Sequence, residues 1–398
     1  MKSLRGMVGQ LLPRLNAAFP TAVLAELVGF LTAEAGATSV RLWLADYDEA
    51  VLAALGGPGG TEPAEVVDIG HGGPGEAFAS QQVVTTSDAT GITVHLPVSL
   101  RAERLGVLTV GLGHLVGPSE APADPVPTVA LTEVAMIMAY VLATAMRYTD
   151  SFERARRREP LNVAAEMQWS LVAARAFSAP QFALAGQVRP AYHIGGDAYD
   201  FCVGPSSLWL AVIDAMGHGT QAAVLTTLAL TTLRNARRGG ESLAVQVETA
   251  DRTINEVFGG GQFVTGLILQ VNLETGSVEM VNAGHPSPYL VRGGQVERIE
   301  VDPHLPIGLF EEGRYTSVPL ELVTGDRWVF VSDGVTEAVT DESSQFGDTR
   351  LAQALADCAG ATAHETVERL YGDLQRAIGD DLRDDATVIV VDWKGPSG

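Results

Sequence analysis

Three shortages in the 398-residue sequence each argue against a class of protein. Only two cysteines occur, Cys202 and Cys358, which argues against a disulfide framework and favours a reducing compartment; we therefore expect a cytoplasmic protein. Basic residues are scarce, because 26 Lys and Arg face 48 Asp and Glu. The resulting net charge of −22 disfavours binding to nucleic acid or to anionic lipid.

Long apolar runs are also scarce. The most apolar stretch, Val134 to Met146, is shorter than the roughly 18 residues of a membrane span, so no membrane segment is expected. Pro13 and Arg14 interrupt the apolar N-terminus and no small-residue cleavage site follows, so we expect no signal peptide. The length predicts two or three domains.

The N-terminal part, residues 1–127, is expected to be one domain that ends in the proline-rich stretch 117–127. Its order of elements is a helix, a strand pair, a glycine-rich loop, a short helix and a second strand pair. This order, and above all the segment from His95 to Leu112, resembles a GAF sensor domain. The resemblance covers about residues 20–147 and implies a small-molecule or protein signal of unknown identity.

Residues 128–177 are expected to form a helical, coiled-coil-like linker. Apolar residues recur there at alternating steps of three and four, which is the heptad pattern of a coiled coil: Leu131, Val134, Met138, Val141, Ala145, Tyr148, Phe152 and Ala155. The alternative is a terminal helix packed on the sheet of its own domain. Pro160 precedes a second expected helix, Leu161 to Phe177, and the third domain is expected over residues 178–398.

Four aspartates in the C-terminal part stand at strand ends or tight turns. Asp197 follows paired glycines, Asp214 and Asp333 each end an apolar run, and Asp384 precedes another apolar run. Converging carboxylates repel one another unless a cation lies between them, and all-oxygen ligation suits Mg²⁺ and Mn²⁺. No Cys/His grouping has the spacing of a zinc site. The alternative is four unrelated turn aspartates.

Seven motifs then occur in order: IGGDAYDF, IDAMGHG, NAGHPSP, PIGL, VSDGVTEA, FG and DDAT. Together they resemble the PPM family of metal-dependent Ser/Thr protein phosphatases, in its bacterial SpoIIE/RsbU-type branch. The resemblance covers roughly residues 162–392. It implies an α+β fold, an α-β-β-α sandwich of two antiparallel sheets with a dinuclear Mn²⁺ or Mg²⁺ site at one edge.

The resemblance assigns roles residue by residue. Asp197, Asp214, Asp333 and Asp384 would be metal ligands, with the backbone carbonyl of Ala215 as a further one. A metal-bridging water would be the nucleophile, so no side chain attacks phosphorus. Asp385 would take the neighbouring position, which is usually not a ligand.

Other motif residues receive lesser roles. The family usually has Trp where Ala198 stands, and the histidine proposed as general acid in eukaryotic relatives falls on Met216. We therefore read His218 as a turn residue and His285 as a residue that bonds the backbone of its own turn. Structural support for the Asp197 turn is expected from two further residues, Tyr199 and Asp200. Arg189 is expected either to meet a phosphate or to form a surface ion pair, and residues 334–347 are a candidate substrate flap.

The resemblance implies a phosphatase whose substrate is a phosphorylated STAS-domain anti-sigma-factor antagonist. A homodimer through the GAF-like domain and the linker helix would pass the signal to the phosphatase domain. Two alternatives stay open: a catalytically silent scaffold that binds a signalling partner, and a hydrolase of small phosphate esters.

Overall fold

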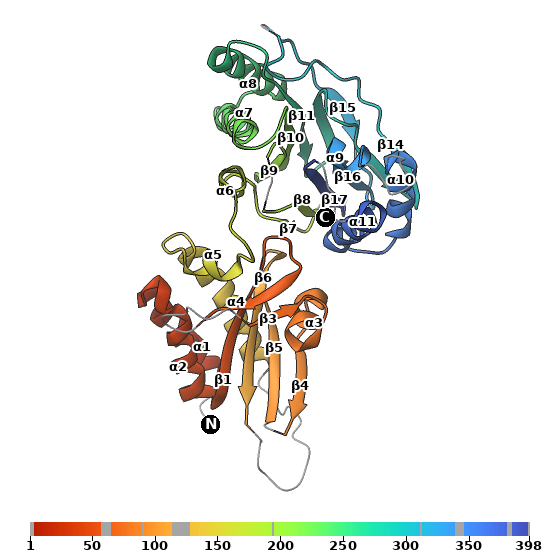
Figure 1. The fold of residues 1–398 in the computed structure, drawn as a ribbon. Helices are drawn as coiled ribbons and strands as arrows, with labels where there is room; N and C mark the ends of the chain where they lie inside the picture. The colour runs from red at the N-terminus through yellow and green to blue at the C-terminus, as the bar shows by residue number, and fades with distance from the viewer. Residues whose placement is uncertain are drawn as a thin grey trace. The chain divides into compact units, whose positions relative to one another are not determined.

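The computed structural model describes residues 4–56, 65–89, 91–113, 128–192, 195–310, 313–338, 346–379 and 384–396. The chain forms two compact units, Met1–Pro160 and Leu161–Gly398, which Figure 1 draws in the colours of the chain. The division falls inside the predicted linker, so the helices before and after Pro160 belong to different units. The proline-rich stretch 117–127 lies outside the described residues.

The N-terminal unit contains a six-stranded antiparallel sheet in the order β3-β2-β1-β6-β5-β4. Side chains alternate across β1, so that Leu42 and Leu44 face helices α1, α2 and α4, whereas Trp43 and Ala45 face helix α3. The elements are α1 (Leu4–Ala17), the 3-10 turn η1 (Pro20–Ala22), α2 (Val23–Ala35), β1 (Ala37–Ala45), β2 (Val51–Ala54), β3 (Val66–Asp68), α3 (Gly72–Ser80), β4 (Val84–Asp88), β5 (Gly91–Leu100), β6 (Glu103–Leu112), α4 (Thr128–Ala145) and α5 (Ser151–Arg156).

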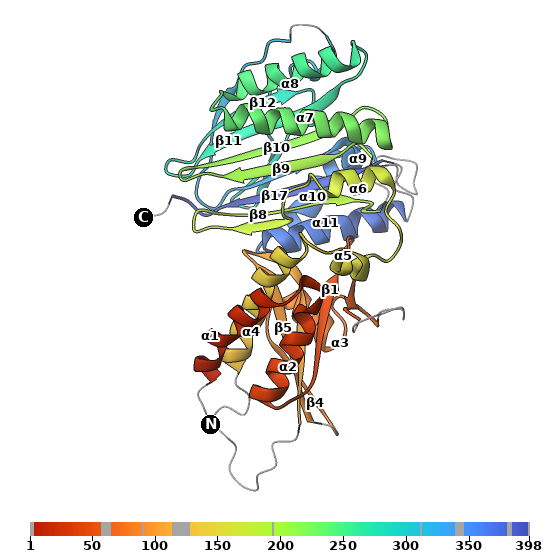
Figure 2. The same cartoon turned by 90° about the vertical axis from the view of Figure 1, so that its left-hand side faces the viewer.

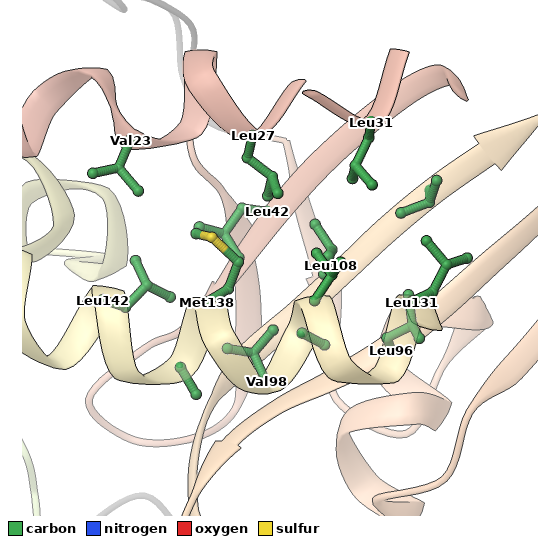
Figure 3. Packing of buried hydrophobic residues seen from close by; sticks show 14 of the residues in the cluster. Val23, Leu27, Leu31, Leu42, Leu96, Val98, Leu108, Leu131, Met138 and Leu142 are labelled. Carbon is green, nitrogen blue, oxygen red and sulfur yellow. The ribbon is translucent and has the colours of Figure 1, made fainter. Parts of the chain in front are cut away.

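The heptad residues of α4 pack inside this unit. Leu131 and Met138 are fully buried and, together with Leu142, lie against Leu108 of β6 and the neighbouring strands (Figure 3). The structure therefore supports the alternative of a helix packed on its own sheet, and the predicted continuous helix to Ala155 is wrong because α4 ends at Ala145.

One described helix bears on the expectation about membrane segments. By length and composition, Thr128–Ala145 is apolar enough to cross a membrane, and half of that window is buried in the structure. The buried half belongs to the core just described, which accounts for much of the apolar character of the helix.

The C-terminal unit is the predicted α-β-β-α sandwich, and Figure 2 shows its layers edge-on. One sheet has five strands in the order β15-β12-β11-β10-β9, and the other has six in the order β14-β13-β16-β17-β8-β7. A core between the two sheets includes Leu210, Val212, Phe330 and Ile389. Helices α7 and α8 cover the outer face of the first sheet, and α10 and α11 cover that of the second.

The bounds of these elements are α6 (Val163–Trp169), β7 (Ala176–Ser178), β8 (Phe182–Arg189), β9 (Ala198–Val203), β10 (Ser207–Ala215), α7 (Thr220–Arg238), α8 (Leu243–Phe258), β11 (Val264–Asn272), β12 (Ser277–Ala283), β13 (Tyr289–Arg292), β14 (Gln295–Arg298), β15 (Val318–Glu321), β16 (Arg327–Val331), α9 (Asp333–Thr336), α10 (Gly347–Asp357), α11 (Ala363–Ile378) and β17 (Ala386–Trp393).

The predicted helix from Leu161 to Phe177 is wrong in its length. Helix α6 ends at Trp169, and the end of the predicted helix is instead the short strand β7. Phe177 pairs with Leu184 in the sheet, and its ring stacks on Phe182 at a centroid distance of 5.8 Å. Pairing of this partly buried aromatic residue in the sheet overrides the local helical pattern.

Candidate metal centre

The four predicted aspartates stand at neighbouring strand ends on one edge of the sandwich. Antiparallel partners explain the arrangement, because one strand ends where its partner begins. Asp197 precedes β9 and Asp214 lies near the end of β10, and these strands pair through Ala198 and Ile213. In the other sheet, Asp333 follows β16 and Asp384 lies just before β17, and these two strands are also paired.

Asp214 shows how strongly this edge opposes negative charge. Burial, followed by the charges of Asp333 and Asp384, raises the pKa of the Asp214 carboxyl to about 7. The pKa of Asp333 is raised by burial and then by Asp384. Carboxylates from both sheets therefore lie close enough to repel one another, which is the electrostatic signature of an oxygen-ligand cation site.

Asp197 is the most deeply buried of the four, with 2% of its surface exposed. Burial, followed by the charges of Asp214 and Asp385, raises the pKa of Asp197 well above its usual range. The hydroxyl of Thr387 donates a hydrogen bond of 2.6 Å to its Oδ2. Thr387 belongs to the opposite sheet, so this bond joins the two sheets at the site.

Glycine is required beside the aspartates because other parts of the chain lie too close to leave room for a Cβ atom. A Cβ on Gly196 would lie 2.7 Å from the Ala215 carbonyl oxygen and 3.2 Å from Oδ1 of Asp214, and one on Gly334 would lie 1.9 Å from the Asp385 carbonyl oxygen. Gly196 does not have a positive φ, so the need is for space rather than for a left-handed backbone. The same contact puts the Ala215 carbonyl beside the Asp197 turn, as is required if this carbonyl is a metal ligand.

His285 lies one strand away from Asp214. Its Nδ1 is 3.1 Å from the Thr265 hydroxyl, and Thr265 pairs with Asp214 between β10 and β11. The imidazole therefore bonds a neighbouring strand's side chain, whereas the backbone N–H of His285 donates to Asn282. Burial lowers the pKa of His285 to about 4, so the ring is neutral at physiological pH.

The remaining motif residues serve the scaffold. The hydroxyl of Tyr199 donates to the Gly186 carbonyl across the sandwich, and Asp200 accepts a hydrogen bond of 2.8 Å from Arg234 on α7. Arg189 forms an ion pair of 3.4 Å with Glu368. These contacts tie the sheets to each other and to the helices.

Two residues before α7 lie at the surface. Met216 and His218 are both exposed, and His218 stands in the turn directly before the N-cap Gly219. Of the candidate flap, residues 339–345 lie outside the described residues.

Among the contacts at the Asp197 turn that the sequence did not indicate, three come from Gln168, Thr226 and Thr387. The amide of Gln168 on α6 donates to the Asp197 carbonyl at 2.7 Å, and the hydroxyl of Thr226 on α7 donates to the Gly196 carbonyl at 2.5 Å. The third is the bond from Thr387 described above. One signal was available, because Gln168 is a polar residue on the buried face of α6 that also holds Ala164 and Ala165.

Comparisons with known proteins find similar sequences and structures for part of this chain. Residues 204–394 match the family model of Stage II sporulation protein E (SpoIIE). Phosphoserine phosphatase RsbU of Bacillus subtilis (strain 168) is 22% identical over 235 residues, which are 59% of this chain and 70% of RsbU. Stage II sporulation protein E of the same organism is 23% identical over 204 residues, which are 50% of this chain and 24% of that protein.

Among solved structures, the RsbU and RsbW domains of Rv1364c from Mycobacterium tuberculosis are similar with 25% identity and a TM-score of 0.46. That match covers 55% of this chain and 63% of the other.

Proposed function

We propose, because the C-terminal unit of this chain carries a SpoIIE-type domain of the PPM family, that the protein is a metal-dependent phosphoserine/phosphothreonine protein phosphatase. The observation that carries the proposal is the convergence of Asp197, Asp214, Asp333 and Asp384 from both sheets on one edge, where burial and like charge oppose ionisation. Such a set of carboxylates is stable in its charged form only beside cations.

The donor set fits two Mn²⁺ or Mg²⁺ ions, because every proposed ligand atom is an oxygen. The four aspartates and the carbonyl of Ala215 would hold them. When bound, these cations would lower the pKa of water and offset the negative charge of a phosphate ester. The chain itself keeps the oxygens in place, since Thr387 orients the Asp197 carboxylate and Gln168 holds its carbonyl.

The proposed substrate is a phosphorylated STAS-domain anti-sigma-factor antagonist. The similarity to phosphoserine phosphatase RsbU supports a phosphoprotein substrate over a small phosphate ester. Removal of the phosphate would free the antagonist to bind its kinase-type partner, so the protein would act in partner switching. We place this activity in the cytoplasm, in agreement with the free thiols of Cys202 and Cys358.

The N-terminal unit is proposed to be a GAF-like sensor for a small-molecule or protein signal. Its six-stranded antiparallel sheet with helices on both faces supports this assignment. A hollow of about 650 Å³ beside β2 and β3, within the range of small-molecule pockets, offers a place for a ligand. Its lining includes Val51, Val66, Asp68, Arg156 and Arg157.

We also propose a homodimer through the N-terminal unit and its last long helix. The buried heptad residues are not available for pairing, but α4 has exposed apolar residues on its other side. Val129, Met136 and Tyr140 are each more than half exposed and follow one another at steps of seven and four. That spacing puts them on one face of the helix.

The test is phosphate release from a phosphoserine STAS protein in EDTA, Mg²⁺ or Mn²⁺, with wild type beside Asp333→Asn. We expect release that depends on the metal and falls by at least about a hundredfold in the variant, because a ligand to the cations is lost. Release that persists in EDTA would contradict a metal mechanism. Tight partner binding with no release under any condition would instead favour the catalytically silent scaffold.

A further inference from the structure

Asp385 has a role at this site that its sequence motif does not indicate. The residue directly precedes β17 in the chain, and it is 8% exposed. One carboxylate oxygen, Oδ2, accepts hydrogen bonds from three successive backbone N–H groups. The distances are 2.7 Å from Gly195, 2.7 Å from Gly196 and 3.3 Å from Asp197. Three converging peptide dipoles form an anion-binding concavity, and here the anion is a side chain of the same protein.

The neighbouring aspartate is placed differently. Asp384 is exposed, and one of its carboxylate oxygens accepts the backbone N–H of Asp385 at 2.9 Å. The two adjacent carboxylates therefore differ in their surroundings. Asp384 is exposed, whereas Oδ2 of Asp385 accepts hydrogen bonds from the backbone of residues 195–197. An oxygen that already accepts three hydrogen bonds is a poor candidate for a metal ligand.

The backbone that Asp385 holds is the one that carries Asp197. Thr387, two residues further along the chain and in β17, donates a hydrogen bond to the Asp197 carboxylate. The segment from Asp385 to Thr387 therefore holds both the backbone and the side chain of Asp197. Gln168 and Thr226 hold the carbonyls of the turn from two helices. A metal ligand must be held within about 0.5 Å of its productive position, and this network supplies the restraint.

We propose that Asp385 is a positioning residue for the metal centre, which holds the Gly195–Asp197 backbone so that the Asp197 carboxylate faces Asp214. The inference rests on the proposed function for the identity of the ligand, a divalent cation. It predicts that the acceptor oxygen of residue 385 matters more than its negative charge. Asparagine keeps a side-chain oxygen acceptor at the same position, whereas alanine removes it.

The first experiment measures Mn²⁺ binding to the metal-stripped full-length protein by titration calorimetry. We expect Asp385→Ala to weaken binding by about ten- to a hundredfold, as is typical when a group that orients a metal ligand is lost. Asp385→Asn should stay within about threefold of wild type, and Asp384→Ala, which removes a proposed ligand, should reduce the number of ions bound. Wild-type binding in Asp385→Ala, or equal loss in the Asn and Ala variants, would overturn the proposal.

The second experiment needs no metal, so it separates this inference from the proposed function. In EDTA, hydrogen–deuterium exchange of peptides covering residues 195–197 should be faster in Asp385→Ala and close to wild type in Asp385→Asn. Unchanged exchange in the alanine variant would overturn the positioning role. Restored protection in Asp385→Asn with no Mn²⁺ binding in wild type would instead contradict the metal centre and leave the role of Asp385 intact. Where Asp385→Ala does not fold, Asp385→Asn still tests the proposal, because a loss of Mn²⁺ binding or of protection in this variant would overturn it.

Discussion

At the scale of single residues, the carboxyl group of Asp214 links pH to stability. Its pKa is about 7 in the folded protein, well above the usual value for aspartate, chiefly because it is buried. A raised folded-state pKa means that the folded protein holds this proton more tightly than the unfolded chain. The associated stability is present below about pH 4 and is lost as pH rises through about 7.

We therefore expect the metal-free protein to become less stable to urea between pH 5 and pH 8, as the Asp214 carboxyl ionises. Asp214→Asn should show a smaller decrease over the same range, since the amide does not ionise. Urea unfolding in EDTA at several pH values measures this. A pH dependence identical in the two proteins would contradict the assignment to Asp214.

A second prediction at the scale of single residues concerns the room for a side chain at Gly334. Its added Cβ would lie 1.9 Å from the Asp385 carbonyl oxygen, so Gly334→Ala should lower the free energy of unfolding by about 1–3 kcal/mol or more. Gly372 in the middle of α11 has no atom within 4 Å of an added Cβ. Gly372→Ala is the matched control, and it should be stabilising by about 0.5–1 kcal/mol. Equal effects of the two substitutions in thermal unfolding would refute the argument from space.

At the scale of elements, α4 has two apolar faces with different roles. Met138 is fully buried in the N-terminal core, whereas Met136 is 53% exposed on the opposite side. A charged residue in place of Met138 would lie in the core without a partner, whereas one in place of Met136 would stay in water. A substitution of Met138 therefore tests folding, and one of Met136 tests association.

Met138→Asp should lower the free energy of unfolding of the N-terminal unit by at least about 3 kcal/mol. Met136→Asp should change it by less than about 0.5 kcal/mol, and should halve the mass in light scattering if α4 pairs as proposed. Urea unfolding and light scattering on the full chain provide both values. An unchanged dimer in Met136→Asp would exclude this face of α4 as the contact.

Helix α6 contacts the turn of the proposed ligand Asp197 through the side chain of Gln168. Gln168 is fully buried, and its amide is bonded to the Asp197 carbonyl. Gln168→Ala should weaken Mn²⁺ binding severalfold because the turn that holds Asp197 loses one of its restraints. The exposed neighbour Glu166→Ala, on the same helix, is the control and should bind like wild type. Calorimetric titration measures both, and similar affinities in the two variants would contradict a role for Gln168.

At the scale of the whole molecule, each unit has its own hydrophobic core. The N-terminal unit is built around its single sheet, and the C-terminal unit has one core between its sheets and one under each helix layer. Units with separate cores unfold as separate cooperative transitions when few contacts join them. A ligand raises the stability only of the unit that binds it.

Differential scanning calorimetry of the full chain should accordingly show two transitions. Saturating Mn²⁺ should raise the midpoint of the one that belongs to residues 161–398 by several degrees and leave the other unchanged. In Asp333→Asn the shift should be much smaller. A single transition in wild type would mean that the two units unfold together, and a shift of both transitions would contradict Mn²⁺ binding by residues 161–398 alone.

For the C-terminal unit, local sequence predicted the buried strands, and the resemblance to the PPM family implied how they are arranged. Apolar runs predicted the buried strands, and the motif set led to the sandwich that the structure has. The positions of the aspartates at strand ends could be read because a strand and its bounding turn are local features. Their roles as ligands stay predictions, and the mutations above test them.

Local sequence patterns were not sufficient where the structure depends on contacts between residues far apart in the sequence. A heptad spacing on α4 is compatible with a partner helix or with a sheet, and only the location of Leu131 and Met138 against β6 and its neighbours decided between them. Helix α6 stops at Trp169, and residues 176–178 join the sheet as β7, where the ring of Phe177 stacks on that of Phe182. Adjacent Asp384 and Asp385 look alike in sequence, yet the 195–197 backbone, about 190 residues away, gives them different surroundings. Sequence by itself determined which residues lie at strand ends. The tertiary structure decided which of them meet, because contacts between distant segments depend on how whole sheets and helices pack.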